Sequence, residues 1–177
     1  MSKRFSLAIG VFLVVAATIT SQALADSPHF LYANSSVSAS TGALSVSFKE
    51  AGLGNSGVTS TQITLTVDRA SAVYQCWNKG GKHPQAGNKE TVSHSLSITQ
   101  TFQVRNGQTT GPITTGPPDP GGFSCPSGQK LYLMSVEYSG IFVHGVGGDS
   151  RRASPDPIGA CLSNAVQTCV LGISLKK

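Results

Sequence analysis

The stretch TVSHSLSITQTFQV, residues Thr91 to Val104, decides the fold class of this 177-residue chain. Serine and threonine occupy alternate positions over most of it. The positions between them form an apolar face that only Gln100 interrupts: Val92, His94, Leu96, Ile98, Phe102 and Val104. Period two is typical of a β-strand with one buried and one solvated face. Because 14 residues is long for a strand, we expect a bend at Gln100.

The same alternation recurs earlier in the chain, from Ala43 to Phe48 and from Ile63 to Cys76. In the second segment the apolar residues change from odd to even positions after Asp68. A shift of one residue turns the side chains to the other face of a sheet. The pattern therefore predicts a bulge or a tight turn between Asp68 and Ser71.

Turn signals separate the remaining strands. Asn106-Gly107 is the preferred pair for a type I′ hairpin turn, so we expect a returning strand from Gln108 to Thr115. The proline-rich segment Gly116 to Gly122 is expected to be a loop, because proline does not donate to a sheet ladder. Gly147 to Gly159, with three glycines and two prolines, is predicted to be a long exposed loop.

Further strands are predicted at Lys130 to Tyr138, Gly140 to Val146 and Val170 to Leu175, the first two being one strand if the chain kinks at Ser139-Gly140. About seven short strands with turn signals between them predict an all-β fold. We interpret it as an antiparallel β-sandwich of the Ig-like, Greek-key type.

The N-terminus has the features of a cleavable signal peptide from Met1 to Ala25. Lys3 and Arg4 precede an uncharged apolar run, Leu7 to Ile19, which is too short to span a bilayer. Small residues at Ala23 and Ala25 suit the cleavage site. We therefore expect residues 26–177 to form one secreted, extracellular domain without a membrane span.

The charge of the chain is low and dispersed. The expected signal peptide holds two of the 13 basic residues, which leaves 11 against 8 acidic residues and a net charge of +3. The basic residues form no run, and aromatic residues do not gather beside them. Nucleic-acid binding proteins usually show such a footprint, so we expect no nucleic-acid partner.

The four cysteines, Cys76, Cys125, Cys161 and Cys169, all lie in the expected secreted part. An even number of cysteines in an exported chain indicates disulfides, and no pair has the short spacing of a zinc knuckle. Three pairings are possible. The short separation favours Cys161 with Cys169, which leaves Cys76 with Cys125.

Catalytic motifs are lacking in the sequence, and we expect a protein that is not an enzyme and needs no cofactor. His94 lies on the apolar face of its strand, where a hydrogen-bonded core histidine is expected. Asp119 and Asp156 are single acids between prolines, whereas a calcium site needs several oxygen ligands, so we expect no metal. A secreted hydrolase, with an acid and a base from separate strands, is the least favoured alternative.

The best candidate for a ligand-binding site is the segment Trp77 to Pro84, which contains the only tryptophan. A tryptophan ring offers a flat face to a sugar or a cation, and a rigid scaffold presents loops for binding. The candidate ligand-binding residues are Trp77, Asn78, Lys79, Lys82 and His83, with a glycan or cell-surface component as ligand. A Cys76–Cys125 bridge would add the Gly116 to Gly122 loop to this site. The alternative is that Trp77 packs over the disulfide.

The Ser/Thr face of Thr91 to Thr101 has two interpretations. It is either a flat recognition surface or the solvated side of a sheet. An uncharged edge strand also invites pairing with another chain. A self-assembling, pilin-like or coat-like surface subunit is therefore the alternative to a secreted binding or envelope-associated module. Phe30 to Val37 is the segment that could serve as a donor strand in such an assembly.

Three segments carry a resemblance: VSFKEAGLG (Val46 to Gly54), YQCWNKGGKHP (Tyr74 to Pro84) and FSCP (Phe123 to Pro126). Together they resemble a group of small secreted proteins that occur widely among actinomycetes. The likeness extends from Leu44 to Asp149. It implies export, a β fold and the pairing of Cys76 with Cys125, and it implies no activity, cofactor or catalytic residue.

Overall fold

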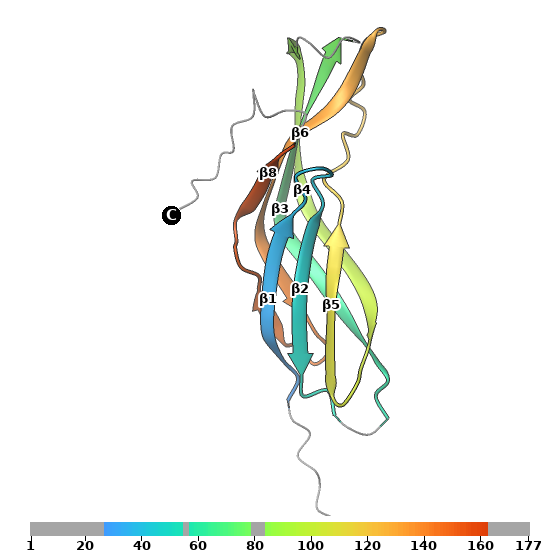
Figure 1. Ribbon diagram of the computed structural model, residues 1–177, viewed down its shortest axis with the longest axis vertical. Helices are drawn as coiled ribbons and strands as arrows, with labels where there is room; N and C mark the ends of the chain where they lie inside the picture. Colours follow the sequence, from blue (N-terminus) through green and yellow to red (C-terminus); the bar gives the residue numbers. More distant parts are fainter. Residues whose placement is uncertain (1–26, 55–56, 79–83, 163–177) are drawn as a thin grey trace, which may run out of the picture.

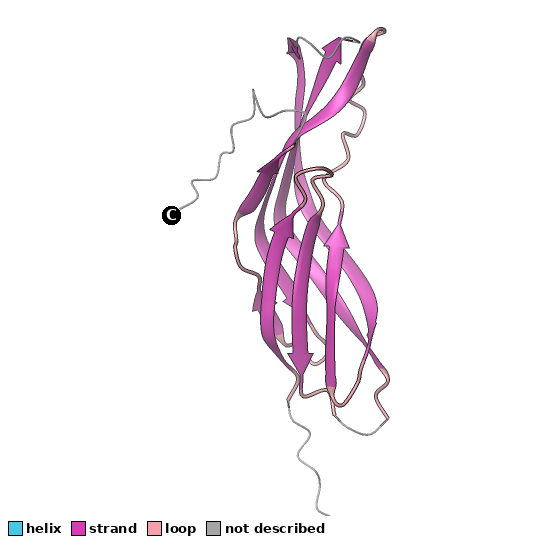
Figure 2. Cartoon of the chain, viewed as in Figure 1, coloured by secondary structure: helices cyan, strands magenta, loops and turns pink. Residues whose placement is uncertain are grey.

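β-Strands make up the regular structure of the described part of the chain. The computed structural model describes residues 27–54, 57–78 and 84–162, and these contain no helix (Figure 1, Figure 2). Consequently they include no helix with the length and apolar character needed to cross a membrane. The strands are β1 (His29–Val37), β2 (Leu44–Ala51), β3 (Ser60–Asn78), β4 (Pro84–Gln103), β5 (Gln108–Thr115), β6 (Gln129–His144), β7 (Ser150–Arg152) and β8 (Ile158–Cys161).

The strands form two antiparallel sheets. A three-stranded sheet has the order β1-β2-β5. A five-stranded sheet has the order β4-β3-β6, with the short strands β7 and β8 both paired to β6. The prediction of an all-β fold with antiparallel strands is confirmed.

One apolar core is shared by the two sheets. On β2, Leu44, Val46 and Phe48 are fully buried at every second position. The Phe48 ring makes edge-to-face contacts with Phe30 of β1 and Phe102 of β4, at centroid distances of 6.0 and 4.9 Å. Because β4 belongs to the five-stranded sheet, the second contact joins the two sheets. Burial of such side chains is the main favourable contribution to folding.

The predicted bulge in β3 is confirmed. The register with β4 passes from Val67 opposite Leu96 to Ala70 opposite His94, so β3 holds one residue more than β4 at this point. On the other side of β3 lies Gly140 of β6, with φ of 64°. A side chain at Gly140 would overlap with the Asp68 carboxyl group. Glycine is therefore required where β6 passes the bulge.

The turn at Asn106-Gly107 has the predicted geometry but connects different partners. Both residues have positive φ, 51° and 69°, and β5 begins at Gln108 as expected. Only one bridge, between Arg105 and Gln108, joins the two sides of the turn. β5 pairs with β2 instead, so the expected hairpin is wrong. The turn carries the chain from one sheet to the other, because both sheets must face the common core.

Two other predictions are wrong. Residues 147–159 are not an exposed loop, because they contain β7 and the start of β8, and Ala153 is buried. Glycine and proline are typical of loops, so the sequence pattern did not indicate these short strands, which pair with the edge of β6. His94, expected in the core, is exposed although it lies opposite the buried Ala70, because it is on the edge strand β4. The expected strand at 170–175 and the expected signal peptide lie outside the described residues.

Candidate functional site

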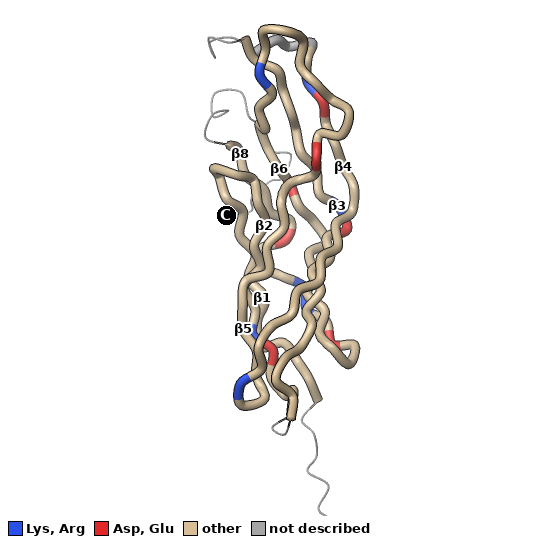
Figure 3. Tube along the Cα trace, turned by 90° about the vertical axis from the view of Figure 1, so that its right-hand side faces the viewer, with Lys and Arg blue, Asp and Glu red and all other residues tan. Residues whose placement is uncertain are grey.

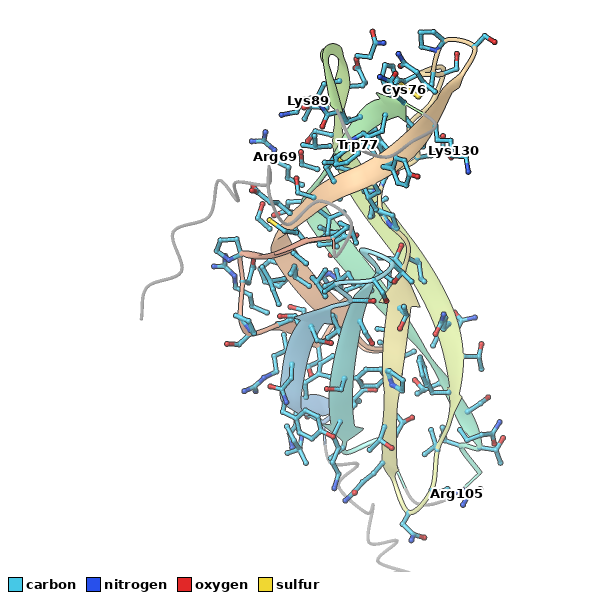
Figure 4. All side chains as sticks on the ribbon, turned by 45° about the horizontal axis from the view of Figure 1, so that its top comes forward. Arg69, Cys76, Trp77, Lys89, Arg105 and Lys130 are labelled. Carbon is cyan, nitrogen blue, oxygen red and sulfur yellow. A yellow bond between two sulfur atoms is a disulfide. The ribbon has the colours of Figure 1, made fainter. Side chains whose placement is uncertain are left out.

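Three strands extend past the three-stranded sheet and form one end of the elongated molecule (Figure 1). We call this end the tip; it comprises residues 74–78 of β3, residues 129–133 of β6, the first residues of β4 and the connecting segment 116–128. Within it, β3 and β6 pair from Tyr74 opposite Leu133 to Asn78 opposite Gln129. Figure 4 shows Cys76, Trp77 and Lys130 at this end and Arg105 at the opposite end.

A disulfide joins the connecting segment to the tip. Cys76 is bonded to Cys125, with a Cα–Cα distance of 5.6 Å, which confirms this predicted pairing. The Tyr74 hydroxyl also donates a hydrogen bond of 2.6 Å to the Pro118 carbonyl. Burial raises the pKa of the Tyr74 hydroxyl, and Asp119 raises it further, so this group stays a donor. Segment 116–128 is therefore held against one face of the tip.

Cys161 ends β8, and its expected partner Cys169 lies outside the described residues. The pairing of Cys161 with Cys169 stays a prediction.

Trp77 lies on the face of the tip opposite the disulfide. Cys76 and Trp77 are neighbours in β3, so their side chains point to opposite sides of the sheet. The Trp77 ring makes an edge-to-face contact with Tyr132 of β6, at a centroid distance of 5.9 Å. Lys130 is the direct cross-strand partner of Trp77 and is exposed. We call the surface formed by Trp77, Tyr132 and Lys130 the Trp face.

The Trp face contains an unpaired polar atom. Nε1 of Trp77 is buried, and within the described part of the chain no hydrogen-bond acceptor contacts it. A buried N–H group without a partner is energetically costly, and such groups are rare in folded proteins. The remainder of the Trp77 side chain is partly exposed.

The structure brings together only part of the predicted ligand-binding set. Asn78 is exposed, but strand alternation turns it away from Trp77, towards the face of the disulfide. Its cross-strand partner Gln129 accepts a hydrogen bond of 3.0 Å from Asn88. Lys79, Lys82 and His83 lie outside the described residues. The Gly116 to Gly122 loop lies on the opposite side from Trp77, so it does not extend the Trp face.

Sequence reasoning missed Tyr132 and Lys130, although both lie in a segment that was predicted to be a strand. Their alternation along β6 gives the face they occupy, but only the register with β3 places them beside Trp77.

The Ser/Thr face of β4 continues across the five-stranded sheet. The Thr99 hydroxyl lies 2.8 Å from that of Thr64, and the Thr66 hydroxyl lies 2.8 Å from Nε2 of His144. The His144 ring stacks on Phe142 at a centroid distance of 6.2 Å. The hydroxyl groups bond to one another across the strands, so part of this row stabilises the sheet.

We call the described part of the chain outside the tip the body; its end opposite the tip holds a buried carboxylate. Glu50 continues the inward face of β2 and is fully buried, and neither of its carboxylate oxygens has a hydrogen-bond partner among the described residues. A side chain at Gly145 would overlap with Glu50, so glycine there makes room for the carboxylate. Burial, and after it the charge of Asp149, raise the pKa of Glu50 to about 7 against the opposing effect of His29.

A groove of about 640 Å³ lies at the same end of the body. It is lined by the exposed Val58 and Val146 and by the buried Thr61, whose hydroxyl has no hydrogen-bond partner in the part of the chain that the structure describes. Among the residues that the structure describes, no three histidine, cysteine or acidic side chains are grouped as metal ligands would be.

Comparison with known proteins adds no relative to this description. No protein-family model, curated protein or solved structure matches the chain.

Proposed function

We propose that the chain is a secreted, non-catalytic β-sandwich protein of the Ig-like type, braced by two disulfides, that binds a glycan of the cell surface or matrix. The ligand would bind at the Trp face. The resemblance to small secreted actinomycete proteins agrees with this proposal. The strongest support for the proposal is the position of the single tryptophan, which is partly exposed beside Tyr132 and Lys130. A disulfide stabilises the opposite face of the tip.

The chemistry of the Trp face suits a sugar ring. The faces of indole and phenol rings are flat and apolar, and they pack well against the C–H groups of a pyranose. The rings lie at an interplanar angle of 62°, so together they form a corner instead of one flat platform. Lys130 adds a cation at the margin, which favours a glycan with carboxylate or sulfate groups.

A rigid base under the rings favours binding. The disulfide and the Tyr74–Pro118 hydrogen bond fix the opposite side of the same strands. A site that is already ordered loses less conformational entropy when a ligand binds. Segment 116–128 thus contributes to the Trp face indirectly, by holding β3 and β6 in register.

A glycan array probed with the secreted protein, followed by fluorescence titration of the glycans that bind, tests the proposal. Trp77 is the only tryptophan in the chain, so the emission reports on the Trp face alone. We expect Lys130→Ala and Tyr132→Ala each to weaken binding by about tenfold, and Trp77→Ala by more, measured by calorimetry. Tyr32→Ala is the matched control, because Tyr32 is an exposed aromatic side chain on β1.

Two outcomes would contradict the proposal. One is a Trp77→Ala variant that folds normally and binds every hit with undiminished affinity. The other is hydrolytic turnover of a glycan that disappears when one histidine or carboxylate is changed.

A further inference from the structure

We propose that the free edge of β4 pairs with the same edge of a second copy of the chain, which forms a dimer with two-fold symmetry. The inference does not depend on glycan binding. It starts from a comparison of the four sheet edges, because an unpaired strand edge is a template for another strand unless the fold protects it.

The edge of β6 is protected along most of its length. β7 and β8 pair with two separate parts of it. Between them, the Asp156 carboxylate accepts hydrogen bonds of 3.0 Å from the N–H groups of Gly140 and Ile141. Asp156 also forms an ion pair with Arg152. The donors that the two short strands leave unpaired are therefore satisfied by a side chain.

The two edges of the three-stranded sheet are protected in other ways. The backbone of Ser154 bonds to Ser35 and Ala33, at 3.0 Å each, and so covers part of the β1 edge. β5 contains Pro112 at its centre, which removes one backbone donor while its pairing with β2 continues. Proline on an edge strand is a common protection against strand addition.

β4 has none of these features along residues 91–101. It is the edge strand of the five-stranded sheet, and its described pairing is with β3 alone. Residues 91–101 contain no Lys, Arg, Asp, Glu or Pro. Most of the trace in Figure 3 is free of charge, and its marked charges lie at scattered positions. An edge strand of this length without charge or proline is expected to accept a partner strand.

The side chains of β4 also leave the core incompletely covered. Four apolar residues of this strand pack against the core but are only partly buried: Val92, Leu96, Ile98 and Phe102. By contrast, Leu65 and Val67 on β3, the cross-strand partners of Ile98 and Leu96, are buried. A strand added beside β4 would cover this margin, and burial of apolar area would stabilise the complex.

A second copy is the partner that fits this edge best. Two β4 strands related by a two-fold axis are antiparallel, and residues 91–101 bring no like charges together. Serine and threonine side chains would meet serine and threonine on one face, and the partly buried apolar residues would meet on the other. Because the opposite edge of the five-stranded sheet is covered by β7 and β8, pairing ends at two copies.

The Phe30 to Val37 segment does not act as a donor strand in this arrangement. It lies within β1, which pairs with β2 of its own chain. The geometry thus points to a closed dimer and not to the pilin-like chain of subunits that the sequence left open.

A charge placed on the inward side of β4 separates this proposal from other modes of association. Gln100 lies opposite the buried Ile63 yet is itself exposed, so Gln100→Lys adds an inward-facing charge without filling the core. Ser47→Lys is the matched control, because Ser47 is exposed on the central strand of the other sheet. Neither residue belongs to the Trp face.

Sedimentation equilibrium of the protein as its host secretes it, from micromolar to millimolar concentration, gives the dissociation constant of the dimer. We expect a monomer–dimer equilibrium that Gln100→Lys weakens by about tenfold or more and that Ser47→Lys leaves unchanged. Hydrogen exchange of residues 91–101 should slow as the concentration rises. A strictly monomeric wild-type protein, larger open assemblies, or equal effects of the two lysine variants would overturn the proposal.

Discussion

The body and the tip are stabilised in different ways. In the body, two sheets enclose a core in which Val46 and Phe48 are fully buried. In the tip, the strands of the five-stranded sheet continue without the three-stranded sheet beside them (Figure 1). There the Cys76–Cys125 disulfide and the Tyr74–Pro118 hydrogen bond hold a connecting segment where a second sheet would otherwise lie.

The difference shows how a small domain extends a surface beyond its core. Apolar burial is not directional and needs side chains from two layers. A covalent bond needs only one residue on each side, so it can brace a region that is too thin for a core. The other face of the tip, where Trp77 and Tyr132 lie, continues the outer face of the five-stranded sheet, opposite the face of Ala70, Ala72 and Tyr74 that packs into the core.

Removal of the disulfide should have the largest effect on stability, and this effect should fall on the tip more than on the body. The bridge closes a loop with a sequence separation of 49, so its loss, as in Cys76→Ala with Cys125→Ala, should cost about 4 kcal/mol. We expect hydrogen exchange to rise most in residues 74–78 and 129–133, and far less in β2. Ser124→Ala, an exposed neighbour of Cys125, is the control. An equal rise in β2 and in the tip would mean that the two regions unfold as one.

The second prediction concerns the pH dependence of stability that arises from Glu50 in the body. The pKa of Glu50 is about 7 in the folded protein against an ordinary value of 4.5, so the folded state binds the proton more tightly. The associated stability is fully present below about pH 4.5 and is lost as the pH rises through 7. The free energy of unfolding should therefore fall by about 3 kcal/mol over this range.

Glu50→Gln should abolish most of that fall and should make the protein more stable than wild type above neutral pH. Denaturant titrations at acidic and at mildly alkaline pH measure the difference. Glu90→Gln, which changes an exposed carboxylate on β4, should leave the pH profile as it is. A wild-type protein whose stability rises between these pH values would contradict the assignment.

The prediction with the smallest expected effect compares two buried tyrosines, one in the body and one in the tip. The Tyr138 hydroxyl donates to the Gly42 carbonyl at 2.7 Å in the body, as that of Tyr74 donates to Pro118 at the base of the tip. Each substitution by phenylalanine should cost about 1 kcal/mol, because it leaves a carbonyl without its donor. We expect Tyr138→Phe to lower global stability, and Tyr74→Phe to act mainly on hydrogen exchange in the tip. Tyr32→Phe, on the surface, should change neither.

Alternation in the sequence predicted the strands but not the assignment of strands to sheets. The pattern of β4, the bulge in β3 and the turn at Asn106-Gly107 were all readable from local residues. The partner of β5 was not, because the inner faces of two sheets that share a core have the same pattern. For the same reason, alternation placed His94 on the inner side but did not reveal that it is exposed.

The candidate site was predicted less completely than the fold. Trp77 and the Cys76–Cys125 pair were identified from residue type and spacing, and from the resemblance. Tyr132 was not, because its contact with Trp77 depends on the register between two strands that are far apart in the sequence. The polar residues expected beside Trp77 were chosen for their proximity in the chain, whereas a strand turns neighbouring side chains to opposite faces.

The contacts of β1 have a consequence for the order in which the molecule assembles. Phe30 donates its backbone N–H to Asp149 at 2.6 Å, and Arg151 donates to the Phe30 carbonyl at 3.0 Å. These partners are 119 and 121 residues further along the chain. β1 pairs with β2, which is close by in the chain, so this pair can form early, whereas the two contacts of Phe30 form only when residues 149 and 151 are in place. Contacts of such long range slow folding and leave apolar strands exposed meanwhile. The β1–β2 pair therefore rests on local contacts, and its attachment to the residues around β7 is expected among the late steps of folding.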